Sequence, residues 1–166
     1  RLRLNTTEIG DGGMAAIAKL TKLRDLDLGH TMVSDKGVAA LSALANLQRL
    51  TLNHTLVKGT SLAAVAGVED LDVANAPVND EGAAEIAKLG KLQSLRMAYT
   101  DVTSAGVKSL AALRQVKRLD LLSTDINDDT LQALAGFTEL EYLNLNYNRV
   151  SAKGLAHLQG LTKLRH

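Results

Sequence analysis

Histidine and aspartate side chains in the first third of the chain are the first candidates for chemistry. His30 and His54 follow similar sequences, and Asp25 and Asp27 precede His30 closely. Imidazole and carboxylate groups together bind zinc and other transition metals. Two imidazoles alone are too few for a metal site, and a chain with no cysteine offers neither thiolate ligands nor a cysteine nucleophile. The sequence therefore predicts no metal and no cofactor.

Two other patterns resemble parts of enzyme active sites. The run Gly10-Asp11-Gly12-Gly13 resembles a phosphate-binding loop, but it lacks the Lys-Ser/Thr ending and aligns with the later turn Ser34-Asp35-Lys36-Gly37. No serine occupies the G-x-S-x-G turn that activates a nucleophile. We therefore expect no enzyme active site in this chain.

Tyrosine and arginine side chains are better candidates, and for binding. The chain has 3 tyrosines and 1 phenylalanine, so aromatic residues are scarce. Tyr99, Tyr142 and Tyr147 lie in the second half, where Arg96 and Arg118 also lie. Tyrosine and arginine are enriched at the energetic centres of protein interfaces. Whether these residues share one surface depends on the elements that carry them.

An internal repeat supplies those elements. The pattern LxxLxLxxTx[VI]xDxGhxxLxxLxx, in which h is apolar, recurs with a usual length of 24 residues, and only the copy at 47–67 is shorter. One repeat domain is therefore expected over 1–166. Its copies start near residues 1, 23, 47, 68, 92, 116, 140 and 164.

Each copy predicts a strand, a turn and a helix. Apolar residues alternate in pairs such as Leu26/Leu28, which is typical of a short strand with one buried face. Val38, Leu41 and Leu44 are spaced three apart, which is typical of a helix, and Ser34 before them is a helix-capping residue type. One such unit cannot bury its own apolar face, so neighbouring copies must stack. The shortened copy at 47–67 is expected to lose part of its helix.

These repeats resemble the leucine-rich repeat family, and the DxG-hxxL-xxL half resembles its ribonuclease-inhibitor-like and bacterial GALA-like variants. The resemblance implies an α/β solenoid of about seven repeats, with a curved parallel sheet on the concave side and short helices on the convex side. The family's asparagine at the ninth position is mostly threonine here, and we expect those hydroxyl groups to form a similar ladder between turns. The ninth positions are Thr7, Thr31, Thr55, Ala76, Thr100, Thr124 and Asn148.

The solvent-facing sheet residues then form the candidate binding surface. Arginine and aspartate alternate along it, as at Arg1, Asp25 and Arg49, and this alternation also fits a ladder of ion pairs that only aids solubility and register. The alternative for the tyrosines is packing on the sheet. The partner-binding residues we predict are Arg96, Tyr99, Arg118, Asp120, Leu122, Tyr142, Asn144, Tyr147, His30 and His54.

Composition limits the class of partner. The formal net charge of +1 does not favour nucleic acid, and no apolar run is long enough to span a membrane. We expect a non-catalytic scaffold that binds another protein on its concave sheet. The alternative is the recognition segment of a larger effector or ubiquitin-ligase-linked protein.

Both terminal copies are as apolar as internal ones, which predicts a piece of a longer chain that can associate end to end. The compartment stays open.

Overall fold

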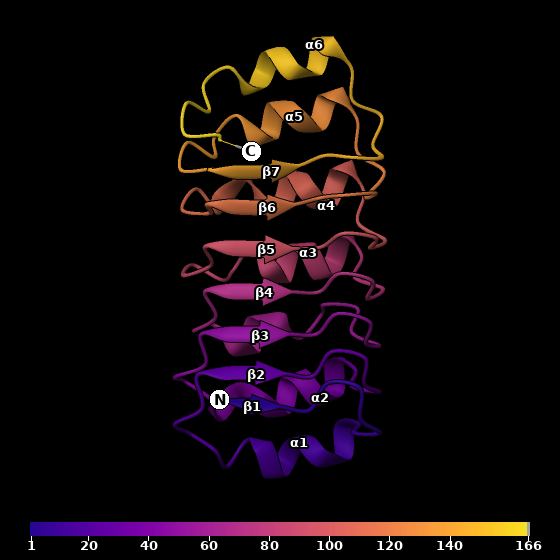
Figure 1. Ribbon diagram of the computed structural model, residues 1–166, viewed down its shortest axis with the longest axis vertical. Coiled ribbons are helices and arrows are strands. Elements are labelled where there is room, and N and C mark those ends of the chain that lie inside the picture. Colours follow the sequence, from indigo (N-terminus) through magenta and orange to yellow (C-terminus); the bar gives the residue numbers. More distant parts are fainter. Residues whose placement is uncertain (166) are drawn as a thin grey trace.

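The computed structural model describes residues 1–165 as a single array of stacked strands and helices (Figure 1). All seven strands lie in one sheet, and each pairs in parallel with the next strand along the chain. The strands are β1 (Leu2–Arg3), β2 (Asp25–Asp27), β3 (Arg49–Thr51), β4 (Asp70–Asp72), β5 (Ser94–Arg96), β6 (Arg118–Asp120) and β7 (Tyr142–Asn144). The predicted parallel sheet is confirmed.

The middle residue of each strand fixes the register of the sheet. Each of these leucines pairs with the equivalent leucine of the neighbouring strand, and from β2 to β6 they are at most 1% exposed. Because alternate strand residues point to opposite faces, burying the central leucine turns its two neighbours toward solvent. The buried leucines are Leu26, Leu50, Leu71, Leu95 and Leu119.

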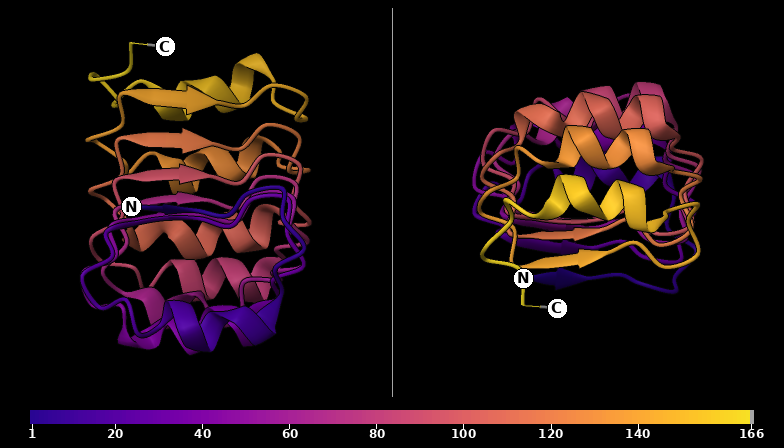
Figure 2. Two further views of the ribbon diagram at one scale, coloured as in Figure 1. Left: turned by 60° about the horizontal axis from the view of Figure 1, so that its bottom comes forward. Right: turned by 90° about the horizontal axis from the view of Figure 1, so that it is seen from above.

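Short helices form the second layer. All of them lie on one side of the sheet, and α1 and α6 extend past β1 and β7 at the two ends, so the sheet is on the inner, concave side (Figures 1 and 2). The α-helices are α1 (Asp11–Ile17), α2 (Asp35–Ala39), α3 (Asp80–Ile86), α4 (Ser104–Ser109), α5 (Asp128–Leu134) and α6 (Ala152–Leu155). The 3₁₀ helices are η1 (Ala40–Ala43), η2 (Leu62–Val65), η3 (Leu110–Ala112) and η4 (Ala156–Leu158).

The shortened copy at 47–67 keeps only the 3₁₀ helix η2 on its convex side, as predicted. Its turn contains Gly59, whose φ of 95° is left-handed. A Cβ atom added to Gly59 would lie 2.7 Å from the Cα atom of Gly82 in the next copy. The shortened loop therefore brings two backbones so close that both positions require glycine.

The threonines do not form the expected ladder between turns. Each hydroxyl donates to the carbonyl oxygen three residues earlier in its own copy, as Thr31 does to Leu28 at 2.6 Å. Among the ninth-position side chains of the described residues, only Asn148 bonds across copies: its amide nitrogen donates to the Leu121 carbonyl at 2.7 Å, and its oxygen accepts from the Thr124 backbone N–H at 3.1 Å. A threonine hydroxyl is too short for this reach. The hydroxyls that donate locally are Thr7, Thr31, Thr55, Thr100 and Thr124.

Aspartate side chains at the start of four helices join neighbouring copies instead. Asp35 accepts from the backbone N–H groups of Lys58 and Ser61, at 2.7 and 3.2 Å. Asp11 accepts from the Ser34 backbone N–H at 2.8 Å and from its hydroxyl at 2.6 Å. Asp128 makes the same two bonds to Ser151, at 2.7 and 2.6 Å. Asp80 accepts from Thr103 in the same way. The first helical residue of one copy thus holds the helix cap of the next copy.

These bonds predict a loss of stability in acid. Hydrogen bonds from Ser34 and Ser151 lower the pKa of Asp11 and of Asp128 below its usual value. A carboxyl group with a lower pKa in the folded state contributes stability above its unfolded pKa of about 3.9, and that contribution is lost as the pH falls through the folded pKa. The double variant Asp11→Asn, Asp128→Asn should therefore show a smaller change in free energy of unfolding between neutral pH and pH 2.

Urea unfolding followed by circular dichroism over this pH range measures the effect. Asp129→Asn is the matched control, because this exposed carboxylate of α5 makes no cross-copy hydrogen bond in residues 1–165. Equal pH dependence of the double variant and the unchanged chain would contradict the role given to these bonds.

Candidate partner-binding surface

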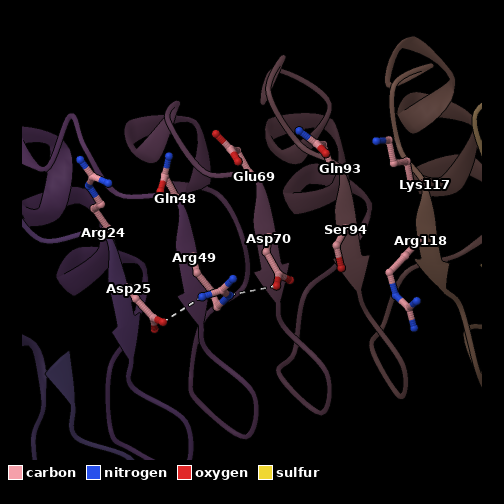
Figure 3. A pocket seen from close by; sticks show the side chains of 10 residues that line it. All are labelled: Arg24, Asp25, Gln48, Arg49, Glu69, Asp70, Gln93, Ser94, Lys117 and Arg118. Atoms are coloured by element: carbon pink, nitrogen blue, oxygen red, sulfur yellow. Dashed lines mark hydrogen bonds and ion pairs between the residues drawn. The ribbon is translucent and has the colours of Figure 1, made fainter. Parts of the chain in front are cut away.

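The first strand residues and Arg1 form a column across the concave sheet, which we call the ladder column. Its N-terminal half is a continuous chain of ion pairs. Asp25 pairs with Arg1 at 3.2 Å. Arg49 pairs with Asp25 at 2.9 Å and with Asp70 at 3.2 Å (Figure 3). The two carboxylates raise the pKa of Arg49. This half of the column is neutralised internally. The ladder column consists of Arg1, Asp25, Arg49, Asp70, Ser94, Arg118 and Tyr142.

The third strand residues form a parallel column with a structural role. The Oδ1 atoms of Asp72, Asp120 and Asn144 each accept from the backbone N–H two residues later, at 3.1 to 3.2 Å. Asp72 also pairs with Arg96 at 3.5 Å, but burial raises the pKa of Asp72 nonetheless. The predicted binding residues Asp120 and Asn144 therefore also fix the turn after their strands.

The C-terminal half of the ladder column is arranged differently. The guanidinium of Arg118 lies 4.8 Å from the centre of the Tyr142 ring, in a cation–π contact. Within residues 1–165, Arg118 makes no ion pair. The structure thus brings Arg118 and Tyr142 together on adjacent strands, with Arg96 on the strand before them, as the repeat alignment predicts.

Five predicted binding residues lie outside the strands. His30, His54, Tyr99 and Tyr147 each have a φ between 53° and 56°, the left-handed region, in the turn that follows the strand. We expected them to be sheet residues, but the strands end three residues earlier, since each spans only three residues. Their side chains form a rim column, at the edge where the strands end. Leu122, also predicted, lies in the same turn as Ser123 and is half-buried.

The rim column contains a stacked pair of histidines and two exposed tyrosines. The His30 and His54 rings stack with centroids 4.1 Å apart and planes inclined by 17°. Tyr99 and Tyr147 are 54% and 82% exposed, so their rings are available to a partner. In the described chain no group of three metal-binding side chains comes together.

Two exposed apolar residues beside the histidines were not predicted. Met32 is 62% exposed and Leu56 is 49% exposed, each two residues after a rim histidine. The equivalent residues of the other copies are charged, such as Glu8 and Asp101, except for Pro77. Comparing that column of the repeat alignment would have found them. Exposed apolar side chains next to stacked rings extend the candidate surface toward the N-terminal half of the rim.

Known proteins share this architecture of stacked strands and helices. The family model described as a leucine-rich repeat matches residues 19–42, 91–111 and 138–158. The solved structure of an internalin C2 from Listeria monocytogenes superposes with a TM-score of 0.84 at 24% identity over 98% of this chain. The fold is a leucine-rich repeat solenoid.

Other leucine-rich repeat solenoids superpose over nearly the whole chain. A further internalin from Listeria monocytogenes has a TM-score of 0.70 at 20% identity over 99% of this chain, and a leucine-rich repeat protein from Leptospira interrogans has 0.66 at 18% over 98%. The chain spans 52% of the former, 47% of the latter and 67% of the internalin C2. No curated protein matches the sequence. None of the helices within residues 1–165 has the length and apolar character that crossing a membrane requires.

Proposed function

We propose that this solenoid is a non-catalytic scaffold that binds a partner protein on its concave sheet. The observation that carries the proposal is the contrast along the ladder column: ion pairs occupy its N-terminal half, whereas Arg118 makes a cation–π contact with Tyr142 and no ion pair within the described residues. Tyr99 and Tyr147 stand exposed at the adjacent rim. Large aromatic and guanidinium groups held in place by a rigid sheet favour protein binding.

The proposal also covers the variant of the repeat and an alternative role for the chain, that of a recognition segment in a larger protein. Helices α1 to α6 on the convex side support a ribonuclease-inhibitor-like or GALA-like variant with 24-residue repeats. The recognition segment of a larger effector or ubiquitin-ligase-linked protein would use the same concave surface. The two roles differ in what a partner triggers, and the contacts on this chain would be the same in both.

A photo-crosslinking amino acid tests which face meets the partner. Placed at Tyr147 and expressed in the source cells, it should form a covalent product with a protein, whereas the same group at Lys108 of α4, on the convex layer, should not. Crosslinking only from Lys108, or none from Tyr147, would contradict the proposal.

The double variant Tyr142→Ala, Tyr147→Ala is expected to weaken binding of the captured partner by about tenfold or more, because tyrosine is enriched among the few interface residues whose truncation costs about 2 kcal/mol or more. The melting temperature should stay close to its original value, since Tyr147 is 82% exposed. Titration calorimetry measures the affinity. The double variant Lys108→Ala, Lys153→Ala, with both residues exposed on the convex helices α4 and α6, is the control and should bind normally.

A further inference from the structure

The ladder column is interrupted at Ser94. Opposite charges alternate from Arg1 to Asp70, but the next side chain is a hydroxymethyl group that is too short to reach Asp70 as Arg49 does (Figure 3). Two shallow grooves of the sheet meet at this point, and Asp70, Ser94 and Arg118 line both of them. The interruption therefore leaves a hollow in the concave face.

The hollow has walls of opposite charge. Glu69 and Asp70 lie on the β4 side, Gln93 and Ser94 form an uncharged floor on β5, and Lys117 and Arg118 lie on the β6 side; we call these six residues the trough. The register places Asp70 beside Ser94 and Ser94 beside Arg118, so the walls are two strand spacings, about 9.6 Å, apart.

Three of the four trough charges make no close ion pair in the described residues. Among residues 1–165, Glu69, Lys117 and Arg118 form no ion pair within 4.0 Å, and Asp70 pairs only with Arg49. The Tyr142 ring holds the Arg118 guanidinium in place, which reduces the entropy lost when a carboxylate binds it.

We infer that the trough seats an extended peptide segment of a partner protein, carrying one basic and one acidic side chain two residues apart. The carboxylate pairs with Arg118, and the cation pairs with Asp70. Lys117 and Glu69, whose side chains point the other way in Figure 3, add charge of the same sign on each side. In an extended segment, residues i and i+2 point to the same side and lie about 6.8 Å apart, and long side chains span the remaining distance to the walls. This inference rests on the proposed function and names the chemistry of its partner.

The charge pattern disfavours other occupants. A uniformly acidic ligand, nucleic acid included, meets the repulsion of Glu69 and Asp70, and a uniformly basic one meets Lys117 and Arg118. A purely apolar segment would bury these charges without partners, which is unfavourable. Only a segment with both charges satisfies both walls.

Selection from a library of random linear peptides displayed on phage tests the inference with the whole chain immobilised. Enriched peptides should carry a Lys or Arg and an Asp or Glu at positions i and i+2, in one of the two orders. On the variant Lys117→Glu, Arg118→Glu, selection should shift to peptides with two basic residues. Enrichment without a charge pair, no enrichment, or the same peptides on both proteins would overturn the inference.

Ser94→Arg provides a second measurement on the best selected peptide. The new guanidinium would pair with Asp70 and fill the trough, so fluorescence anisotropy should show at least about a tenfold loss of affinity. Thr51→Arg is the matched control: it adds the same charge to the concave sheet between Asp27 and Asp72, outside the trough, and should change affinity by less than about twofold.

Equal effects of the two arginine substitutions would place the peptide elsewhere and overturn the inference. The peptide selection uses no native partner, so that result would leave the crosslinking test of the proposed function unaffected. Conversely, a native partner that crosslinks at Tyr147 but ignores Ser94→Arg would keep the function and reject the trough as its seat.

Discussion

Gly106→Ala is expected to lower the free energy of unfolding by about 1 to 3 kcal/mol, although replacing glycine by alanine inside a helix normally stabilises by about 1 kcal/mol. A Cβ atom at Gly106 would collide with the Oδ1 atom of Asp80 and lie 3.0 Å from the Asp80 Cα atom. That oxygen accepts from the backbone N–H groups of Thr103 and Gly106 at 2.8 and 3.0 Å. The substitution therefore displaces a carboxylate that joins two copies.

Thermal and urea unfolding measure this effect, and the melting temperature should fall by about 2 to 4 °C for each kcal/mol in a chain of this size. Gly136→Ala is the matched control, because a Cβ atom there meets no atom within 4 Å. In a double-mutant cycle with Asp80→Ala, the two effects should be less than additive by about 1 kcal/mol or more. Equal stability of the Gly106 and Gly136 variants, or strict additivity, would contradict the clash.

Phe137→Ala is expected to cost about 3 to 5 kcal/mol, the usual range for emptying a buried aromatic site. Phe137 is 1% exposed and lies in the turn after α5, where its N–H donates to the Leu134 carbonyl and its own carbonyl accepts from Leu140. The equivalent positions of the flanking copies hold Leu113 and Leu161. Phe137→Leu should therefore cost only about 1 kcal/mol.

Hydrogen exchange of the Phe137→Ala variant should show which parts of the chain lose local stability. In a solenoid each copy contacts only its neighbours, so protection should fall most in α5 and the strands β6 and β7 and least in β2. A uniform loss of protection along the whole chain would show that the array unfolds as one unit.

The sequence predicted the sheet because its signal is repeated and local. Leu26 and Leu50 alternate with polar residues in the same way in adjacent copies, and stacking those copies gives the observed register. The ladder column, with Arg118 beside Tyr142, follows directly from that register.

The rim residues could not be placed in the same way. Alternation of side chains applies only inside a strand, and Tyr99 and Tyr147 fall in a left-handed turn that their residue types disfavour. The partner of Asp80 was equally hidden, because the pattern DxG shows its aspartate and glycine within one copy, whereas the contact joins the aspartate of one copy to the glycine of the next. Period and register alone do not reveal which side chains meet between copies.

The bonds between copies also set a rule for recombining them. Asp80 and Asp128, which start their helices, face a glycine in the next copy, Gly106 and Gly154. Asp35 instead faces Ser61 of the shortened copy, whose backbone N–H donates to it at 3.2 Å. Where it starts with Ser104, the facing residue is Thr130, and the two hydroxyls bond at 2.6 Å. At these junctions, the residue that starts the helix of one copy determines which residue fits at the facing position of the next copy. Engineered duplication, deletion or shuffling of copies should succeed where the new junction joins Asp to Gly or Ser to Thr, and fail where it joins Asp to Thr.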